Sequence, residues 1–176
     1  MRSPRATATL LLALLFSSFN LVRAAEPTGE LAKKLSDVKF EQYAPAPGYS
    51  EGPTWFRGEV FFCSGPLLRI DAERKAHKHL DLGPAGTVLR ADGHMLIVDH
   101  KYKALLALVS AAKVGVVVDQ FETRPLRSLN VLTCDSRANG YWSYPDGSSS
   151  QTPVGNVYRL QPEWLFDRAP TGMVFP

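Results

Sequence analysis

The stretch SEGPTW, Ser50 to Trp55, places a glutamate beside two turn-forming residues and a tryptophan. Glu51 stands where a proline-punctuated segment gives way to strand-like sequence, so it could begin a chemical site. It could equally be a solvated charge before a Gly-Pro turn, which is where most surface carboxylates are found. The local sequence leaves both interpretations open.

Other reactive side chains fall into weaker patterns. His77 and His79 could form a metal pair, but their position between two expected strands predicts an exposed turn. Asp99 and His100 are adjacent, and adjacent strand residues face opposite ways, so they do not form a simple catalytic pair. Ser143 lacks the Gly-x-Ser-x-Gly nucleophile elbow.

Two further groups predict structure rather than chemistry. The polar loop Asp146–Ser150 has no glycine pattern followed by lysine that would cradle a phosphate. The three tryptophans are expected to pack within the fold rather than to stack on a ligand. They are Trp55, Trp142 and Trp164.

Residues 1–24 have the three parts of a secretory signal. A basic start is followed by the apolar run Leu10–Phe16 and by small or aliphatic residues up to Ala24. The apolar run is too short for a permanent membrane span, and the alternative is a buried N-terminal helix. We therefore expect export, to a periplasm or the exterior, with no membrane association after cleavage.

Charge adds little about partners. The formal charge of +3 at pH 7 includes three arginines of the signal segment, so the mature chain is close to neutral. A neutral domain lacks the basic surface that binds nucleic acid or acidic membranes. Cys63 and Cys134 are the only cysteines, and in an oxidising compartment they could form one disulfide or remain buried thiols.

The remaining chain divides into a linker and a β-rich domain. Residues 25–48 contain a possible short helix, Glu30–Asp37, and the proline-rich connector Tyr43–Gly48. Residues 49–176 alternate short β-type runs with Gly, Asp and Pro turns. The run Ala104–Ala112 has helix-forming composition, but its strand-like neighbours favour a strand, turn and strand.

Three windows of the domain share one plan of strand, turn and further strands. Their turn glycines are Gly58, Gly93 and Gly140, which are 35 and 47 residues apart. This spacing is typical of four-stranded propeller blades, which span about 40–50 residues each, although a generic β-meander would also fit. About three blades do not close a ring, because propellers have typically four to eight. The fold expected is therefore all-β, a partial β-propeller.

The order of these motifs resembles the senescence marker protein/gluconolactonase/luciferin-regenerating enzyme family. SEGPTW with GEVFFC and LRID looks like its opening blade, and RADGHMLIVDH resembles the next repeat. NVLTCDSRANGYWSYP, residues 130–145, is similar to the family segment that begins with Asn-Asp, and TPVGNVYRL resembles the strand that closes that blade. The likeness runs from about Tyr49 to Pro176 and implies the N-terminal half of a six-bladed propeller.

The resemblance implies a metal-dependent hydrolase of a sugar lactone or related ester. Glu51 matches a glutamate ligand of a divalent cation, often calcium, with zinc or manganese as alternatives. Asn130 matches an asparagine beside the metal that holds substrate or water. Val131 and Leu129 depart from the aspartate and proline expected around it, and Asn130 could instead be a turn residue that enters a strand.

The resemblance also predicts what this chain lacks. A further asparagine ligand and a general base would lie beyond Pro176, so we expect a truncated hydrolase that could be inactive, with no certain catalytic residue of its own. The alternative is a non-catalytic propeller remnant or binding module. Half a ring leaves open strand edges, which a homo-oligomer could bury.

Overall fold

The computed structural model describes residues 29–36 and 38–169. The predicted signal segment, residues 1–24, lies outside the described residues. Of the described helices, none is long and apolar enough to cross a membrane. The structure has two units, one ending at Glu41 and one beginning at Gln42.

The first unit contains helix α1, Gly29–Ser36. Its position agrees with the short helix expected from residue 30. Glu30 in the first turn and Lys34 in the last form an ion pair of 3.4 Å, one helical turn apart. An acidic residue near the start and a basic residue near the end also complement the helix dipole.

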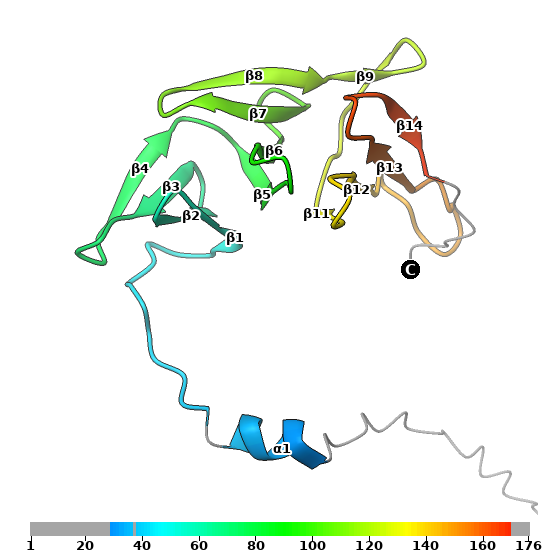
Figure 1. The fold of residues 1–176 in the computed structure, drawn as a ribbon. Coiled ribbons are helices and arrows are strands. Elements are labelled where there is room, and N and C mark those ends of the chain that lie inside the picture. Colours follow the sequence, from blue (N-terminus) through cyan, green and yellow to red (C-terminus); the bar gives the residue numbers. More distant parts are fainter. Residues whose placement is uncertain (1–28, 37, 170–176) are drawn as a thin grey trace, which may run out of the picture. The chain divides into compact units, whose positions relative to one another are not determined.

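Within its described residues, the second unit consists of three four-stranded antiparallel sheets and one small hairpin (Figure 1). Each sheet is a meander in which strands adjacent in sequence pair. We call the sheets blades 1, 2 and 3. Blade 1 comprises β1 Glu51–Phe56, β2 Glu59–Cys63, β3 Leu67–Ile70 and β4 Ala76–Leu80. Blade 2 comprises β5 Pro84–Leu89, β6 Met95–Asp99, β7 Ala104–Ser110 and β8 Lys113–Val118. Blade 3 comprises β11 Leu132–Cys134, β12 Gly140–Tyr144, β13 Asn156–Leu160 and β14 Phe166–Arg168.

These sheets confirm the all-β expectation of about three blades. The run from Ala104 is strand β7, followed by a tight turn and β8, so the strand context outweighed its helix-forming composition. The hairpin of β9, Gln120–Phe121, and β10, Arg124–Pro125, joins blade 2 to blade 3 and was not expected. Its strands have only two residues each, too few to show a period.

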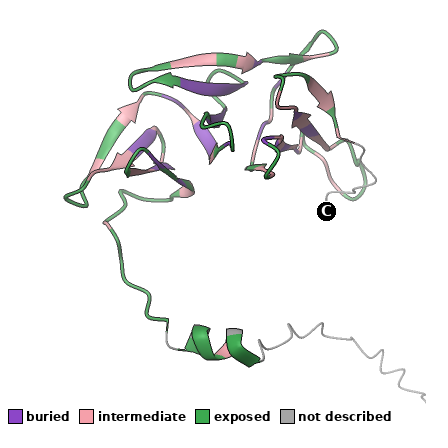
Figure 2. Cartoon of the chain, viewed as in Figure 1, coloured by how far each residue is buried: buried purple, intermediate pink, exposed green. Residues whose placement is uncertain are grey.

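Blade 2 is the middle of the array, and its inner strands are buried on both faces (Figure 2). All five residues of β6 are buried. Successive strand residues point to opposite faces, so Met95 and Ile97 face blade 1 while Leu96 and Val98 face blade 3. A continuous apolar strand is what two-sided burial requires.

The interface between blades 1 and 2 is one apolar cluster. Phe56, Phe61 and Leu67 of blade 1 pack there against Met95, Ile97 and other residues of blade 2. The rings of Phe56 and Phe61 meet edge to face, with centroids 5.9 Å apart. Such pairs add stability beyond the area they bury.

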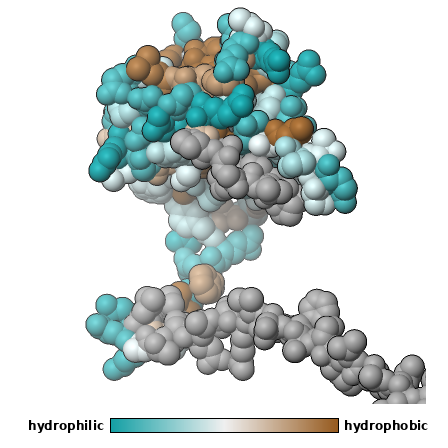
Figure 3. Space-filling model, turned by 90° about the vertical axis from the view of Figure 1, so that its right-hand side faces the viewer, coloured by the Kyte–Doolittle hydropathy of each residue, from teal (hydrophilic) through white to brown (hydrophobic). Residues whose placement is uncertain are grey.

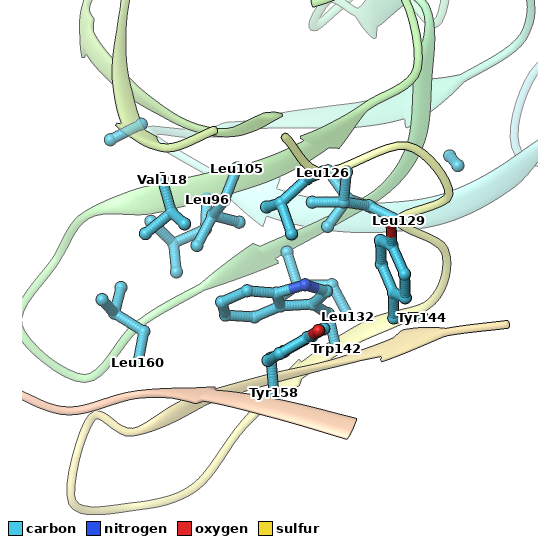
Figure 4. Close-up of a cluster of buried hydrophobic side chains, with 13 residues drawn as sticks. Leu96, Leu105, Val118, Leu126, Leu129, Leu132, Trp142, Tyr144, Tyr158 and Leu160 are labelled. Atoms are coloured by element: carbon cyan, nitrogen blue, oxygen red, sulfur yellow. The ribbon is translucent and has the colours of Figure 1, made fainter. Parts of the chain in front are cut away.

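Trp142 is the centre of the interface between blades 2 and 3 (Figure 4). Only 1% of its surface is exposed. Its ring stacks on Phe166 at 5.2 Å and lies 5.8 Å from the ring of Tyr158. Leu96 and Leu105 of blade 2 belong to the same cluster. Figure 4 shows them on the blade 2 side of the indole.

The first strands of the three blades approach closely because two glycines lie between them. A Cβ on Gly52 of β1 would lie 2.9 Å from the Cα of Gly86 in β5, and Gly52 has a φ of +58°. A Cβ on Gly86 would lie 3.5 Å from the amide nitrogen of Leu132 in β11. The Thr87 hydroxyl donates a hydrogen bond of 2.6 Å to the carbonyl oxygen of Gly52. The glycines therefore permit backbone contact along the inner side of the array.

Five of the connections within the blades use two kinds of turn. Arg57 and Gly58 both have positive φ, the two-residue turn that suits a twisted hairpin. Four other turns share one pattern, in which the fourth of five residues is left-handed and donates its N–H to the first carbonyl. The left-handed residues are Arg74, Gly93, Ala138 and Trp164.

Gly140 was expected in such a turn, and this expectation is wrong. Gly140 is the first residue of β12, and Ala138 takes the left-handed position with a φ of 63°. A Cβ on Gly140 would lie 3.2 Å from the side chain of Leu96. The glycine therefore serves close packing between blades 2 and 3.

The outer faces of the two end blades differ. Register places Phe62 and Leu68 on the face of blade 1 that points away from blade 2, yet both are buried. The connector residues Ala44, Pro45 and Ala46 line the cavities next to them, so the connector covers this apolar face.

The corresponding face of blade 3 is polar. Arg159 binds the carboxylate of Asp167 through Nε at 3.0 Å, and Gln161 donates to the same carboxylate. On the side of the array seen in Figure 3, hydrophilic residues predominate below a hydrophobic upper rim.

Candidate functional site

One end of the array gathers the residues that the sequence singled out. Strands β1 and β5 run side by side in the same direction, because Gly52 contacts Gly86 and the hydroxyls of Thr54 and Thr87 are 2.8 Å apart. Glu51 begins β1, and Asn130 lies two residues before β11. Both candidates therefore lie at the end where the inner strands start, on blades 1 and 3, with β5 between them (Figure 1).

Glu51 is half-buried at the start of β1. Its carboxylate accepts a hydrogen bond of 3.2 Å from the Tyr49 hydroxyl. The negative charge of Glu51 raises the pKa of Tyr49, because it disfavours a phenolate beside it. The Glu51 side chain lines a cavity of about 200 Å³ that is shared with the connector. Because Tyr49 donates to only one oxygen of the Glu51 carboxylate, the other oxygen has no hydrogen bond from the described residues.

Asn130 is held by its backbone and leaves its side chain unbound. Its N–H donates to the carbonyl oxygen of Ser143 at 3.0 Å, and the Ser143 N–H donates to Val131. These bonds extend the β11–β12 ladder beyond the strand ends. Within the described part of the chain, the Asn130 amide makes no hydrogen bond and is half-buried. A fixed backbone with a free amide is suited to hold water, substrate or a cation.

His100 connects blade 2 to the segment before Asn130, a link that sequence reasoning missed. Its Nε2 lies 2.5 Å from the carbonyl oxygen of Leu129. Because a carbonyl oxygen only accepts, the imidazole must carry a proton on Nε2. The backbone N–H of His100 also donates to Gly83 at 2.8 Å. The contact joins residues 29 positions apart, so no local pattern could have indicated it.

Asp99 and His100 act separately, as the sequence indicated. The Asp99 side chain is fully buried and accepts hydrogen bonds from the N–H groups of Gly83 and Tyr102, both at 2.7 Å. Two backbone donors satisfy a buried carboxylate and fix the turn after β6. Asp99 is therefore structural in this arrangement.

The cysteines are free thiols and remain protonated at neutral pH. Burial, together with the nearby charges of Glu51 and Asp99, raises the pKa of Cys63 to about 12. Burial raises the pKa of Cys134 to about 11, although Arg90 acts in the opposite direction. Since the thiolate is the reactive form, neither cysteine is poised as a nucleophile or metal ligand.

The two other candidate histidines lie in strand β4, so the exposed turn expected there is wrong. His77 binds Asp71 at 2.6 Å, and His79 packs edge-on against Phe61 at 4.9 Å. Burial lowers the pKa of His79. Both histidines are thus engaged in blade 1.

The three tryptophans differ in how far they are buried. Trp142 packs in the core as expected, but Trp55 is 60% exposed. Trp164 lies beneath the guanidinium of Arg90 at 4.4 Å. The interpretation as packing residues therefore holds for Trp142 and not for Trp55.

The donor chemistry of Glu51 and Asn130 fits a hard cation, but their number does not complete a site. Carboxylate and amide oxygens are ligands that calcium accepts, and calcium takes six to eight of them. Nowhere in residues 29–36 and 38–169 do three or more His, Cys, Asp or Glu side chains gather as a metal site. The described residues would supply only part of a coordination sphere.

Comparison with known proteins shows the fold. No family model and no curated protein matches the chain. Among solved structures, a structural-genomics target provisionally assigned as a gluconolactonase has a TM-score of 0.63 at 18% identity. The match covers 73% of this chain and 50% of that one. The fold is a partial β-propeller of the gluconolactonase type.

Two other solved structures agree on this partial propeller. A gluconolactonase of Xanthomonas campestris matches with a TM-score of 0.60 at 18% identity, over 69% of this chain and 47% of that one. Virginiamycin B lyase from Staphylococcus aureus has a TM-score of 0.53 at 12% identity, over 72% of this chain and 44% of that one. The chain thus spans about half the length of the gluconolactonase-type propellers it matches.

Proposed function

We propose that this chain carries part of the site of an exported, metal-dependent hydrolase that opens a sugar lactone or a related ester. One observation carries the proposal. Glu51 at the start of β1 and the free amide of Asn130, two residues before β11, occur at the same end of the array in a gluconolactonase-type fold. In this proposal Glu51 is a ligand of a divalent cation, and Asn130 orients substrate or water beside it.

The cation proposed is calcium, with zinc or manganese as alternatives. When bound, such an ion polarises a lactone carbonyl and lowers the pKa of a bound water. The chain's own residues would position the reactants. Glu51 offers a carboxylate oxygen, Asn130 offers an amide that can donate and accept, and His100 holds the backbone next to Asn130.

In this proposal the remaining ligands and the general base come from groups other than Glu51 and Asn130. Water, another part of the protein or a second copy of the chain could supply them. Calcium held by one carboxylate and one amide alone would bind weakly. The proposal therefore predicts weak cation binding by this chain, and lactonase activity only where the other ligands are present.

The test combines cation binding with lactone hydrolysis. Thermal unfolding of the protein is followed with calcium, zinc and manganese chlorides, and hydrolysis of glucono-δ-lactone is followed by acid release. We expect calcium to raise the melting temperature of the wild type and Glu51→Gln to abolish this shift. Glu73→Gln is the matched control, because Glu73 is an exposed residue of the β3–β4 turn. Equal curves for wild type and Glu51→Gln at millimolar calcium would exclude the metal assignment.

A second candidate is a non-catalytic β-propeller module. It is favoured by the lack, among the described residues, of any group of three His, Cys, Asp or Glu side chains that could hold a metal. In that case calcium leaves the protein unchanged, and lactone hydrolysis stays at the uncatalysed rate for the wild type and for Glu51→Gln alike.

A further inference from the structure

A cavity of about 750 Å³ lies in blade 3, between the β9–β10 hairpin and the loop that joins β12 to β13. Its volume falls within the range of small-molecule sites, about 300–1,000 Å³. The β12–β13 loop follows Tyr144, and the neighbouring Ser143 pairs with Asn130. The cavity therefore opens at the same end of the array as the candidate site. Neither Glu51 nor Asn130 lines it.

Three aromatic rings form the inner wall of this cavity. Tyr158 packs against Phe121 at 5.1 Å and edge-on against Tyr144 at 5.4 Å. Tyr144 and Tyr158 are buried, and the Tyr144 hydroxyl accepts a hydrogen bond of 3.0 Å from the backbone N–H of Arg127. The inner wall is therefore aromatic, and its rings are packed against one another within the blade.

Two charged side chains in the lining have no partner within the described residues. The Arg124 guanidinium and the Asp146 carboxylate are exposed and make no hydrogen bond or ion pair there. Both residues, with Tyr144, also line an adjoining hollow of about 330 Å³. Asp146 has a φ of 46° and is followed by Gly147 at 73°, so the backbone of the loop turns sharply at the cavity.

The other two charges of the cavity are already engaged with each other. Arg168 lies 4.0 Å from the carboxylate of Glu122 and 5.2 Å over the ring of Phe121. Two arginines and two acids leave the lining neutral in sum. A polyanion such as a nucleotide would gain no net attraction, and a lipid chain would have to desolvate the charges.

The lining matches the chemistry of a polyhydroxylated ring. Hydroxyl groups can donate to the free carboxylate of Asp146, and ring or carboxylate oxygens can accept from the guanidinium of Arg124. The carbon face of such a ring is apolar and can pack on the aromatic wall.

We propose that this cavity binds a monosaccharide-sized pyranose, as a neutral sugar or as its acid. Asp146 accepts from ring hydroxyls, Arg124 donates to oxygen, and Tyr144 and Tyr158 support the ring face. An acid adds a carboxylate that Arg124 can bind with two parallel hydrogen bonds. The proposal stands on the cavity alone and does not require a metal at Glu51.

The experiment titrates the full chain with D-glucose and, separately, with D-glucuronate, using calorimetry and shifts of amide resonances. The two probes share the pyranose ring and differ in the carboxylate. We expect at least one of them to bind with a Kd on the order of 1 mM. The shifted amides should lie around Phe121, Asp146 and Asn156, which line the cavity.

Variants then assign the contacts. Asp146→Asn should weaken either probe about tenfold, and Arg124→Gln should weaken glucuronate about tenfold but glucose less. Arg137→Gln is the matched control, because Arg137 is an exposed arginine in a turn of the same blade that does not line the cavity. It should change neither affinity.

The outcomes separate this proposal from the metal proposal. Glu51→Gln should leave sugar binding intact, even if it abolishes a calcium response. Failure of both probes to bind, or binding that is indifferent to Asp146→Asn and Arg124→Gln, would overturn the pyranose site. A calcium response with no sugar binding would leave the metal proposal standing and remove this one.

Discussion

The imidazole Nε2 of His100 donates to the carbonyl oxygen of Leu129 at 2.5 Å. This contact joins the turn after β6 in blade 2 to the residue before Asn130 at the entry of blade 3. Leu129 itself is fully buried in the cluster around Trp142. The hydrogen bond and the buried side chain together fix the segment from which the Asn130 amide extends.

His100→Ala should therefore loosen the segment at Asn130 more than the rest of the fold. The loss of one hydrogen bond is expected to lower the free energy of unfolding by about 1 kcal/mol. Hydrogen exchange should be faster at the backbone N–H of Asn130, which donates to the carbonyl oxygen of Ser143. His100→Gln, which keeps a donor, should restore part of the protection. Unchanged exchange at Asn130 in His100→Ala would show that the contact does not position this residue.

Because β1 and β5 lie so close together, Gly52→Ala is expected to lower the free energy of unfolding strongly. The added Cβ would lie 2.9 Å from Gly86 Cα, and the φ of +58° is left-handed. Backbone displacement and strain together should cost about 2–4 kcal/mol, measured by urea denaturation. Gly58→Ala tests the backbone term alone, since its φ is +85° but no atom lies within 4 Å. It should cost about 1 kcal/mol.

Gly48→Ala is the control for both glycine variants. Its added Cβ meets no atom within 4 Å, and its φ is not left-handed. It should leave the stability within about 0.5 kcal/mol of the wild type. If Gly52→Ala were as mild as Gly48→Ala, the packing of β1 on β5 would not be as close as the structure shows.

The strands were predictable because their signals are local. Alternating apolar residues and recurring turns indicate four-stranded units from Glu51 onward, and the structure has three of them. Gly140 misled the prediction because another residue can adopt a left-handed turn, and Ala138 does so. The glycine was needed for a contact with Leu96, 44 residues away, which no turn rule describes.

The candidate site was predictable only in its residue types. Glu51 and Asn130 came from a family resemblance, and their location at one end of the array follows from the parallel inner strands. The link from His100 to Leu129 depends on how two blades pack, so sequence spacing could not indicate it. The cavity of blade 3 likewise needs the β9–β10 hairpin, whose strands were too short to detect.

Because Phe61 and Phe62 lie on opposite faces of β2, replacing each with alanine should lower the free energy of unfolding by different amounts. Phe61 packs into the cluster between blades 1 and 2, whereas Phe62 points away from blade 2 and is covered beside the connector. Phe61→Ala should lower the free energy of unfolding by about 3–5 kcal/mol, as in other cores. Phe62→Ala should cost about 2 kcal/mol, because an exposed connector can settle into the space left behind.

The connector itself supplies the control for Phe62. The double variant Pro45→Gly and Pro47→Gly makes the chain over this face more flexible in the unfolded state and less suited to cover it. Binding of a hydrophobic dye should increase, and the added cost of Phe62→Ala should shrink in this background. Equal costs for Phe61→Ala and Phe62→Ala in the wild type would mean that the connector covers blade 1 as firmly as blade 2 does.

The raised pKa of Cys63 predicts how stability changes in alkaline solution. Burial raises the pKa of this thiol to about 12 in the folded protein, whereas the pKa of an unfolded cysteine is about 8.5. Between these values the folded state holds a proton that the unfolded state has lost. The stabilising effect of the neutral thiol is therefore complete below about pH 8.5 and declines as the pH rises toward 12.

Cys63→Ala should remove the part of this decline in stability that comes from Cys63 and leave the contribution of other groups unchanged. Stability of wild type and variant is measured by urea denaturation from pH 7 to pH 10, under reducing conditions. The difference between them should shift in favour of the variant above about pH 8.5, by at most about 1.4 kcal/mol per pH unit for one proton. Cys134→Ala should show nearly the same relative gain, because its folded pKa of about 11 also lies above the highest pH measured. A constant difference between wild type and Cys63→Ala across this range would mean that Cys63 ionises in the folded protein as readily as in the unfolded chain, and that its burial at the end of β2, opposite Glu51, is not maintained in solution.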